Sequence, residues 1–278
     1  EAIRVQNPNL TAWNNEGPVW GAPNGCVVSI RFNTQRQPFD NVALRQAINA
    51  AIDRDQIVNL AYEGSVKKAI LPFSSYRGML DYVDQLEKSL DVGVLDQHDL
   101  SKVDQLLQGA GFTKSGGAWV QPDGSPLQIA VQVGQGDPVG PVLVQQLKSA
   151  GFDAIVNVQQ VTAQTEALST GNFGLSVYPH CGSLYDPWQT LEHFHSKYAA
   201  PEGQAATNLR AVTRYGNPDL DALLDKMEAS QPSPDNPEYA DLVEQATATF
   251  VRDLPEIPLF EEIQTQPFNT TYWTGYPS

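Results

Sequence analysis

Apolar and polar residues follow two different periods along the middle of the chain. Short apolar runs at 127–133, 152–158 and 174–179 have the length and composition of buried strands. Between them, at about 138–150 and about 162–170, the residues suit amphipathic helices, and the first of these stretches ends at a glycine. Strands that alternate with helices at this spacing are typical of a right-handed parallel α/β unit. The pattern therefore predicts an α/β fold.

The preceding part of the chain is predicted to add one strand and two helices. An apolar strand at 26–34 is followed by an amphipathic helix at about 41–62. Residues 65–95 mix short apolar pieces with proline and glycine, which indicates loop with fragments of helix. Another helix is predicted at about 99–110. We expect the strand at 26–34 to join the sheet antiparallel, beside the strand at 174–179.

Both ends of the chain are predicted to be extended. Residues 1–25 contain closely spaced prolines and glycines, which indicates extended irregular chain. Two helices are predicted near the other end, at about 218–229 and 236–253, with a proline-rich stretch between them. From Ile257 onward the chain is again predicted to be extended.

The composition is that of an acidic globular protein. Of 278 residues, 41% are hydrophobic and 18% are charged, and the net charge is -15. An acidic surface suits solubility and does not suit a phosphate backbone, so we expect no nucleic-acid partner. No apolar run approaches the roughly 20 residues needed to span a membrane. The chain starts at Glu1 without the pattern of a signal sequence.

The two cysteines, Cys26 and Cys181, each lie at the edge of a predicted strand. If those strands are neighbours in one sheet, a disulfide is geometrically possible, and an exported protein would allow it. Free buried cysteines are also common. The sequence leaves both states open.

Several segments carry a family resemblance, and they follow one another in a consistent order. The strand, turn and helix of residues 31–54 carry most of it. Further matching segments are 57–64, 104–112, 116–127, 217–221 and 253–260. Together they resemble the family 5 extracellular solute-binding proteins of ABC importers, which are receptors for peptides, nickel and oligosaccharides. The resemblance spans nearly the whole chain.

This resemblance implies a fold and a domain organisation. The expected fold is a periplasmic-binding-protein-like type II lobe, in which helices flank a mainly parallel sheet with one antiparallel strand. Family members are longer, so the chain is expected to be a C-terminal piece of such a receptor. In that case residues 1–25 form a linker or hinge segment, and residues 26–257 form the α/β ligand-binding lobe. Residues 258–278 then return toward a first lobe that lies outside this sequence.

The resemblance also implies a function. A family member captures its ligand between two lobes that close by hinge motion, and delivers it to the subunits of an ABC permease. We therefore expect a receptor rather than an enzyme, extracellular or periplasmic, either soluble or anchored as a lipoprotein. A monomer without cofactor or metal is expected.

The ends of the chain narrow the resemblance. Residues 268–278, 8–13 and 18–21 resemble the branch that binds β-linked gluco-oligosaccharides such as cellobiose. Our main expectation is therefore an oligosaccharide ligand. An oligopeptide or dipeptide receptor of the same family is the alternative, and an α/β enzyme has the weakest case.

Patterns for other chemistry fit poorly. The glycines of 134–140 lie between a strand and a helix, but their spacing differs from that of a dinucleotide-binding loop. The histidines that follow Cys181 lack the paired ligands of a zinc site. The sequence also has no nucleophile elbow and no Walker loop.

Two loops at the carboxyl ends of predicted parallel strands, 134–138 and 178–188, form the candidate site. They should open on one edge of the sheet, where open α/β sheets bind ligands. Aromatic faces can stack on a sugar ring and carboxylates can accept its hydroxyl groups, but the aromatics could equally pack beneath the domain. Trp119, in a predicted hairpin, is assigned to the fold. The candidate ligand-binding residues are Trp13, Trp20, Gln135, Asp137, Tyr178, His180, Tyr185, Asp186, Trp188 and Trp273.

Overall fold

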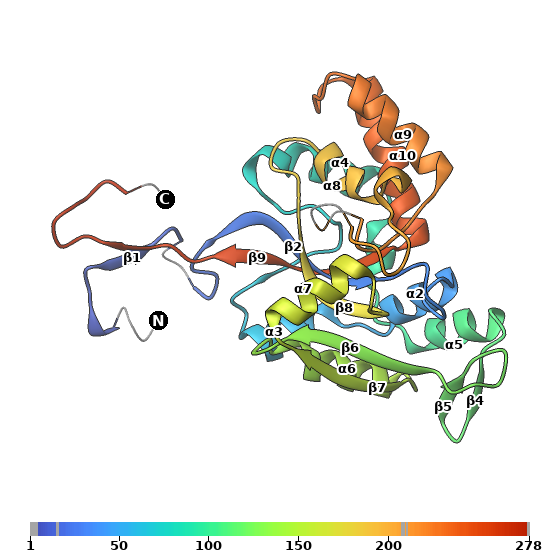
Figure 1. Cartoon of the computed structure of the whole chain (residues 1–278). Coiled ribbons are helices and arrows are strands. Elements are labelled where there is room, and N and C mark those ends of the chain that lie inside the picture. The colour runs from blue at the N-terminus through green and yellow to red at the C-terminus, as the bar shows by residue number, and fades with distance from the viewer. Residues whose placement is uncertain (1–4, 15–16, 207–208, 210, 277–278) are drawn as a thin grey trace.

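A six-stranded sheet forms the centre of the molecule (Figure 1). The computed structural model describes residues 5–14, 17–206, 209 and 211–276. In spatial order the strands are β3 (Lys67–Lys68), β9 (Glu256–Gln264), β2 (Ala22–Phe32), β8 (Leu175–Cys181), β6 (Gln128–Gly134) and β7 (Asp153–Gln159). Strands β9, β8, β6 and β7 run in one direction, and β2 and β3 run in the other. The expected fold class, an α/β lobe with a mainly parallel sheet, is confirmed.

The parallel half of the sheet is built as the sequence predicts. Strand β6 leads through α6 (Val139–Ser149) to β7, and β7 leads through α7 (Val161–Thr170) to β8. Strand β6 pairs in parallel with both β7 and β8. One buried core contains Val131 and Val133 of β6 together with Leu143 and Leu147 of α6. This shared burial explains why apolar residues recur at regular spacing in both segments.

The expected antiparallel strand is β2, and it pairs with β8 as predicted. On its other side β2 pairs with β9, so the chain beyond Ile257 stays inside the sheet as far as Gln264. Strand β3 is a second antiparallel strand and was not predicted. It has two residues, too few for an alternation of apolar and polar positions to be recognised. The predicted neighbours β2 and β8 bring Cys26 opposite Cys181, and these residues form a disulfide.

The prediction of a single helix at about 41–62 is wrong in one respect, because two helices occupy this stretch. They are α2 (Val42–Ala50) and α3 (Arg54–Tyr62). Asp53 has an extended backbone between them, and its side chain accepts a hydrogen bond from the backbone N–H of Gln56. An aspartate in this geometry begins a new helix. Helix α5 (Leu100–Gly109), in the range predicted for a helix, begins after Asp99 in the same way.

A small hairpin follows α5. It consists of β4 (Thr113–Ser115) and β5 (Ala118–Val120). Trp119 is 1% exposed, and its indole N–H donates to the carbonyl of Ala150 at 2.9 Å. The structural role expected for this tryptophan is confirmed.

A second core lies between helices on one side of the sheet (Figure 1). Its helices are α4 (Leu80–Ser89), α8 (Trp188–Leu191), α9 (Pro218–Ala229) and α10 (Pro237–Asp253), with short 3-10 turns at Arg77–Met79, Val92–Asp96, Glu192–Phe194 and Ser196–Tyr198. Helices α9 and α10 match their predicted ranges closely. Helix α4 lies in the stretch expected to be mostly loop, and it buries Tyr82 and Leu86, four residues apart, in this core.

The two ends of the chain leave the body of the molecule together (Figure 1). Strand β1 (Leu10–Ala12) pairs antiparallel with β10 (Pro267–Asn269), and Leu10 lies opposite Asn269. We call this ribbon, with the residues that follow β10 up to Tyr276, the terminal arm. Tyr272 and Trp273 on the arm are 89% and 73% exposed, so they pack against little of the described chain.

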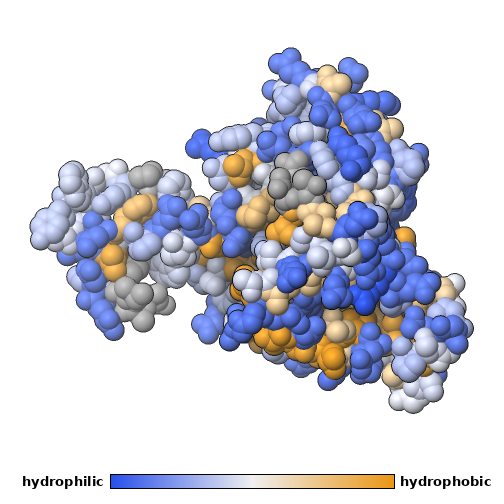
Figure 2. Space-filling model, viewed as in Figure 1, coloured by the Kyte–Doolittle hydropathy of each residue, from blue (hydrophilic) through white to orange (hydrophobic). Residues whose placement is uncertain are grey.

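Apolar surface also gathers along the lower margin of the molecule, in the region of β7 and α6 (Figure 2). Ile155 and Val158 of β7 are among the exposed large hydrophobic residues of the described chain. Among the helices of the described residues, none is both long enough and apolar enough to cross a membrane.

Candidate functional site

The carboxyl ends of β6 and β8 meet at one edge of the sheet. The two strands are parallel, with Val131 opposite Leu175, so the loops that follow Gly134 and Cys181 open on the same edge. This placement of the two candidate loops agrees with the sequence analysis. It is the edge at which open α/β sheets bind ligands.

A hollow of about 440 Å³ opens beside this edge, and we call it the edge hollow. Its volume lies within the range of small-molecule sites, roughly 300–1,000 Å³. Three of the candidate residues line it, namely Trp20, Asp137 and Tyr178. Residues that the sequence analysis did not single out also line it, among them Tyr62, Ser65, Phe260 and Glu262.

Tyr62 joins α3 to the loop before α6. Its hydroxyl donates to Oδ1 of Asp137 at 2.9 Å, and its ring packs against that of Phe260 with centroids 4.5 Å apart. The same carboxylate oxygen accepts from the backbone N–H of Val139, so it also supports the start of α6. Burial, followed by the charge of Asp137, raises the pKa of Tyr62 well above its ordinary value. The hydroxyl therefore stays protonated and acts as a donor at physiological pH.

Glu262 supplies a second carboxylate to the edge hollow from β9. Its Oε2 accepts from the side-chain amide of Asn24 at 3.0 Å. Asn24 also accepts from the backbone N–H of Cys26, which is one of the two disulfide-bonded cysteines. The hollow therefore combines two carboxylates with an indole and two tyrosines, a set that suits a cationic or hydroxyl-bearing ligand.

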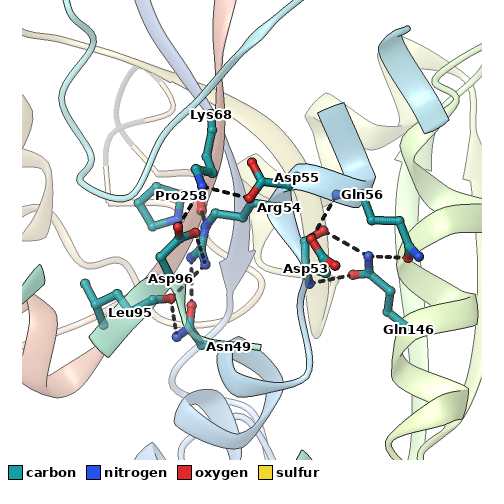
Figure 3. Close-up of polar contacts among 10 residues, drawn as sticks. All are labelled: Asn49, Asp53, Arg54, Asp55, Gln56, Lys68, Leu95, Asp96, Gln146 and Pro258. Atoms are coloured by element: carbon teal, nitrogen blue, oxygen red, sulfur yellow. Dashed lines mark hydrogen bonds and ion pairs between the residues drawn. The ribbon is translucent and has the colours of Figure 1, made fainter. Parts of the chain in front are cut away.

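A buried polar network fixes the elements that carry the edge hollow (Figure 3). Arg54, at the start of α3, is 2% exposed. Its guanidinium donates to the carbonyls of Pro258 in β9 and Leu95, and to Oδ1 of Asn49, each at 2.7 Å. Asp96 lies 3.8 Å from the guanidinium and accepts from Lys68 at 2.7 Å. Burial lowers the pKa of Arg54 to about 10, against the charge of Asp96, so the group remains a cation.

The same network ties α6 to α3. The side-chain amide of Gln146 in α6 donates to the carbonyl of Asp53 at 3.0 Å and to Oε1 of Gln56 at 2.8 Å (Figure 3). Tyr62, Asp137 and Phe260 thus come from α3, the loop before α6, and β9, and this network holds α3, α6 and β9 together. Such support keeps a binding site in one geometry.

A smaller hollow of about 260 Å³ lies next to the strands that lead into the arm. Candidate residue Trp13 lines it, together with Tyr76 and Leu184. Tyr185, another candidate, is 70% exposed and makes an edge-to-face contact with Tyr76 at 6.2 Å. These two candidates lie apart from the edge hollow.

Three candidates from the second loop have partners inside the protein, which corrects the expectation that they face a ligand. The His180 ring is 2% exposed, with Nδ1 2.9 Å from Oε1 of Glu256 and Nε2 2.7 Å from Nδ1 of His193. Trp188 packs against the second core, and its indole N–H donates to the carbonyl of Leu224. Asp186 accepts from the backbone N–H of Trp188 and from the hydroxyl of Tyr239. All three therefore stabilise the helical side of the lobe.

The remaining two candidates are exposed. Gln135 lies in the loop after β6, where its backbone N–H donates to the carbonyl of Gln159. Trp273 lies on the terminal arm. The structure does not bring either of them into the edge hollow.

Behind His180, a buried ion pair joins the neighbouring strands β2 and β9. Oε2 of Glu256 in β9 lies 3.2 Å from Nε of Arg31 in β2, and both side chains are at most 3% exposed. Ser29 donates to the other carboxylate oxygen. Burial raises the pKa of Glu256, but the charges of His180 and Arg31 outweigh it, so this pKa lies below its ordinary value. Single polar residues within apolar strands are the only trace of this cluster in the sequence of the described residues.

The described residues offer one group of side chains close enough to share a metal ion, formed by Cys26, Cys181 and Glu262. The two sulfur atoms are bonded to each other, so they do not supply thiolate ligands. We therefore assign no metal site to this group.

The fold and the edge hollow define an α/β ligand-binding lobe of the periplasmic-binding-protein type. Solved structures share this fold. One is a periplasmic oligopeptide-binding protein of an ABC transporter from Thermotoga maritima, solved with bound mannohexaose. Its TM-score is 0.82 and its sequence is 20% identical, and the match covers 100% of this chain and 51% of that one. Another is the oligopeptide-binding protein AppA of Bacillus subtilis with a nonapeptide, with a TM-score of 0.76 and 22% identity over 99% of this chain and 51% of that one.

The chain belongs to the bacterial extracellular solute-binding proteins, family 5, whose model matches residues 3–202. Among its relatives are the oligopeptide-binding protein OppA of Bacillus subtilis, 22% identical over 92% of this chain, and heme-binding protein A of Haemophilus influenzae, 27% identical over 87%. The chain spans 44% and 40% of the length of these two proteins. The expected family is confirmed, but the cellobiose branch within it is not.

Proposed function

We propose that this chain is one lobe of the substrate-binding receptor of an ABC importer, and that the receptor captures an oligopeptide. The edge hollow carries this proposal, because Asp137 and Glu262 place two carboxylates beside Trp20. Carboxylates in such a place can bind an ammonium group and accept hydrogen bonds from peptide N–H groups. The names of several relatives support a peptide ligand in preference to the oligosaccharide that the sequence favoured.

In this proposal the ligand lies between this lobe and a second one, and both chain ends cross between them. Residues 1–25 and the segment after Gln264 are the proposed crossings, and the lobe itself spans residues 26 to 264. The antiparallel pairing of Leu10 with Asn269 supports this, since it keeps the two ends side by side as they leave the sheet. Two adjacent linkers allow one lobe to rotate against the other as a hinge.

We propose a monomeric binding protein, not an enzyme, that works outside the cytoplasmic membrane as a lipoprotein or a free protein. It would deliver its ligand to the permease subunits. The family description, extracellular solute-binding proteins, supports this location.

An oligosaccharide is the second candidate ligand. The Thermotoga maritima structure with the same fold contains mannohexaose, although that protein is described as oligopeptide-binding. In this chain Trp20 could stack on a sugar ring, and the carboxylates of Asp137 and Glu262 could accept its hydroxyl groups.

Titration calorimetry on the receptor, extended to the length of its relatives, tests the two candidates. The protein is titrated with a library of di- to nonapeptides and, separately, with cello- and manno-oligosaccharides. Submicromolar binding of a peptide whose N-acetylated form binds at least about tenfold more weakly supports the proposal. Binding of an oligosaccharide alone overturns the peptide assignment, and turnover of either ligand overturns the receptor assignment.

A further inference from the structure

A second hollow, of about 620 Å³, lies between helix α7 and the outer part of the sheet. It is lined by β6 and β7 on one side and by α7 on the other. Ala130 and Gln132 of β6 face it, and they alternate with Ile129, Val131 and Val133, which belong to the main core. We call it the amide hollow. It lies on the other face of β6 from the main core and shares no lining residue with the edge hollow.

Three carboxamide side chains gather on its sheet face. Gln132 lies directly opposite Asn157 in the parallel register, and Gln159 follows two residues along β7. The Gln159 amide donates to Oδ1 of Asn157 at 2.9 Å. The side-chain N–H groups of Asn157 and the side-chain carbonyl of Gln159 have no hydrogen-bond partner among the described residues.

Gln132 is the unusual member of the group. It is 5% exposed, yet its side-chain amide makes no hydrogen bond with any described residue. Gln164 of α7, which is buried at a similar level, donates to Ser176 and to the carbonyl of Val177. The amide atoms of Gln132 are not among the fully buried polar atoms of the described residues that lack a partner, so they reach the open space of the hollow. The Gln132 amide is therefore free to donate to, and accept from, a ligand that enters the amide hollow.

The rest of the lining fits a neutral ligand. Among the described residues that line it, Arg36 and Glu166 are the charged ones. They have opposite signs, and Arg36 is paired with Glu202 at 3.7 Å. This balance contrasts with the net charge of -15 on the whole chain. Small apolar side chains, Ala130, Ala163 and Ala167, form part of the remaining wall.

We propose that the amide hollow binds a saccharide unit. Carboxamides both donate and accept, and so do sugar hydroxyl groups, whereas the alanine side chains match the C–H face of a pyranose ring. The three amides form a cluster rather than a row, which favours a compact ring over an extended peptide. The proposal does not depend on the ligand of the edge hollow.

Side-chain amide NMR on the 278-residue chain tests the proposal, with glucose and cellobiose as probes and N-acetylglycinamide as the neutral peptide probe. We expect saturable shifts of the Gln132, Asn157 and Gln159 NH₂ signals with at least one sugar. Shifts of these signals with N-acetylglycinamide alone would overturn the ligand class. The absence of saturable shifts with every probe would overturn the site.

Two variants and a matched control locate the binding. Gln132→Leu removes the unpaired amide, and Ala163→Leu fills the hollow while keeping all three amides. Each should weaken sugar binding at least about tenfold. Thr162→Leu, on the exposed side of the same helix, should leave it unchanged. If Ala163→Leu folds and binds the sugar as tightly as the parent chain, the site lies elsewhere. Trp20→Ala, in the edge hollow, should not move these amide shifts, so failure here is distinct from failure of the proposed function.

Discussion

The hydroxyl of Tyr62 donates a 2.9 Å hydrogen bond to the carboxylate of Asp137, which ties the end of α3 to the loop before α6. Both residues line the edge hollow. One of them comes from a helix C-terminus and the other from a strand-to-helix loop, so a single bond sets the spacing of two walls of the proposed site.

Replacing Tyr62 with phenylalanine should remove this bond and keep the ring contact with Phe260. We expect a loss of about 1.5–3 kcal/mol in the free energy of unfolding, since the acceptor is charged. Urea denaturation measures it. Tyr272→Phe, at a position that is 89% exposed, is the control and should change stability by less than about 0.5 kcal/mol. Equal stability of the two variants would show that the Tyr62 bond contributes nothing.

Much of this fold could be predicted because β6, α6 and β7 bury one face each in a common core, and burial on one face leaves a readable period. The break at Asp53 was missed because apolar residues recur on both sides of it, so the capping side chain was the only signal. The pairing of β9 with β2 was missed because partner choice depends on contacts between residues more than 200 positions apart, such as Arg31 and Glu256.

The site was harder to predict than the fold. Ser176 and His180 lie on the face of β8 that carries polar contacts, whereas Leu175 and Val177 lie in the main core. Alternation along this strand could have shown that His180 faces the helical layer. For Trp188 no such signal existed. Its burial depends on α9, which lies more than 25 residues further along the chain.

Glu256 should make stability depend on pH in the acid range. Its pKa is lowered in the folded state, so its contribution is fully present above the unfolded value, near 4.5, and is lost as the pH falls through the folded value. Stability of the wild type should therefore fall below pH 4.5, in part through this residue. Glu256→Gln should make that decline shallower and cost about 3–5 kcal/mol near neutral pH, because Arg31 loses its buried partner. Denaturation curves at several pH values check both effects, and an unchanged slope would contradict the assignment.

Arg54 should matter more for stability than an exposed arginine does. Arg54→Met keeps much of the side-chain volume but removes three hydrogen bonds at 2.7 Å, so we expect a loss of at least about 2 kcal/mol. Arg36→Met is the matched control, since its ion pair with Glu202 is exposed and should contribute less than about 1 kcal/mol. Thermal or urea unfolding compares the two. Similar losses in both variants would mean that the network around Arg54 adds little.

The disulfide between Cys26 and Cys181 should stabilise the lobe, because it links residues 155 positions apart. A reductant should lower the free energy of unfolding by about 2–5 kcal/mol. The double variant Cys26→Ala/Cys181→Ala should show a similar loss and no further response to reductant. Thiol labelling of the denatured, unreduced protein gives a direct check, and two reactive thiols per chain would show that the bond does not form.

Replacing Trp20 should affect ligand affinity, whereas replacing Trp188 should affect the free energy of unfolding. Trp20 lines the edge hollow, whereas Trp188 packs in the second core and donates to the carbonyl of Leu224. In the receptor extended to the length of its relatives, Trp20→Ala should weaken ligand binding by at least about 2 kcal/mol, since binding energy concentrates in a few aromatic contacts. Trp188→Ala should leave affinity nearly unchanged in the folded protein, but lower the free energy of unfolding by about 2 kcal/mol or more through lost packing. Calorimetry and urea denaturation on both variants give the comparison. If Trp188→Ala lowers affinity and Trp20→Ala does not, the ligand binds at the loop after β8, as the sequence first indicated, and not in the edge hollow.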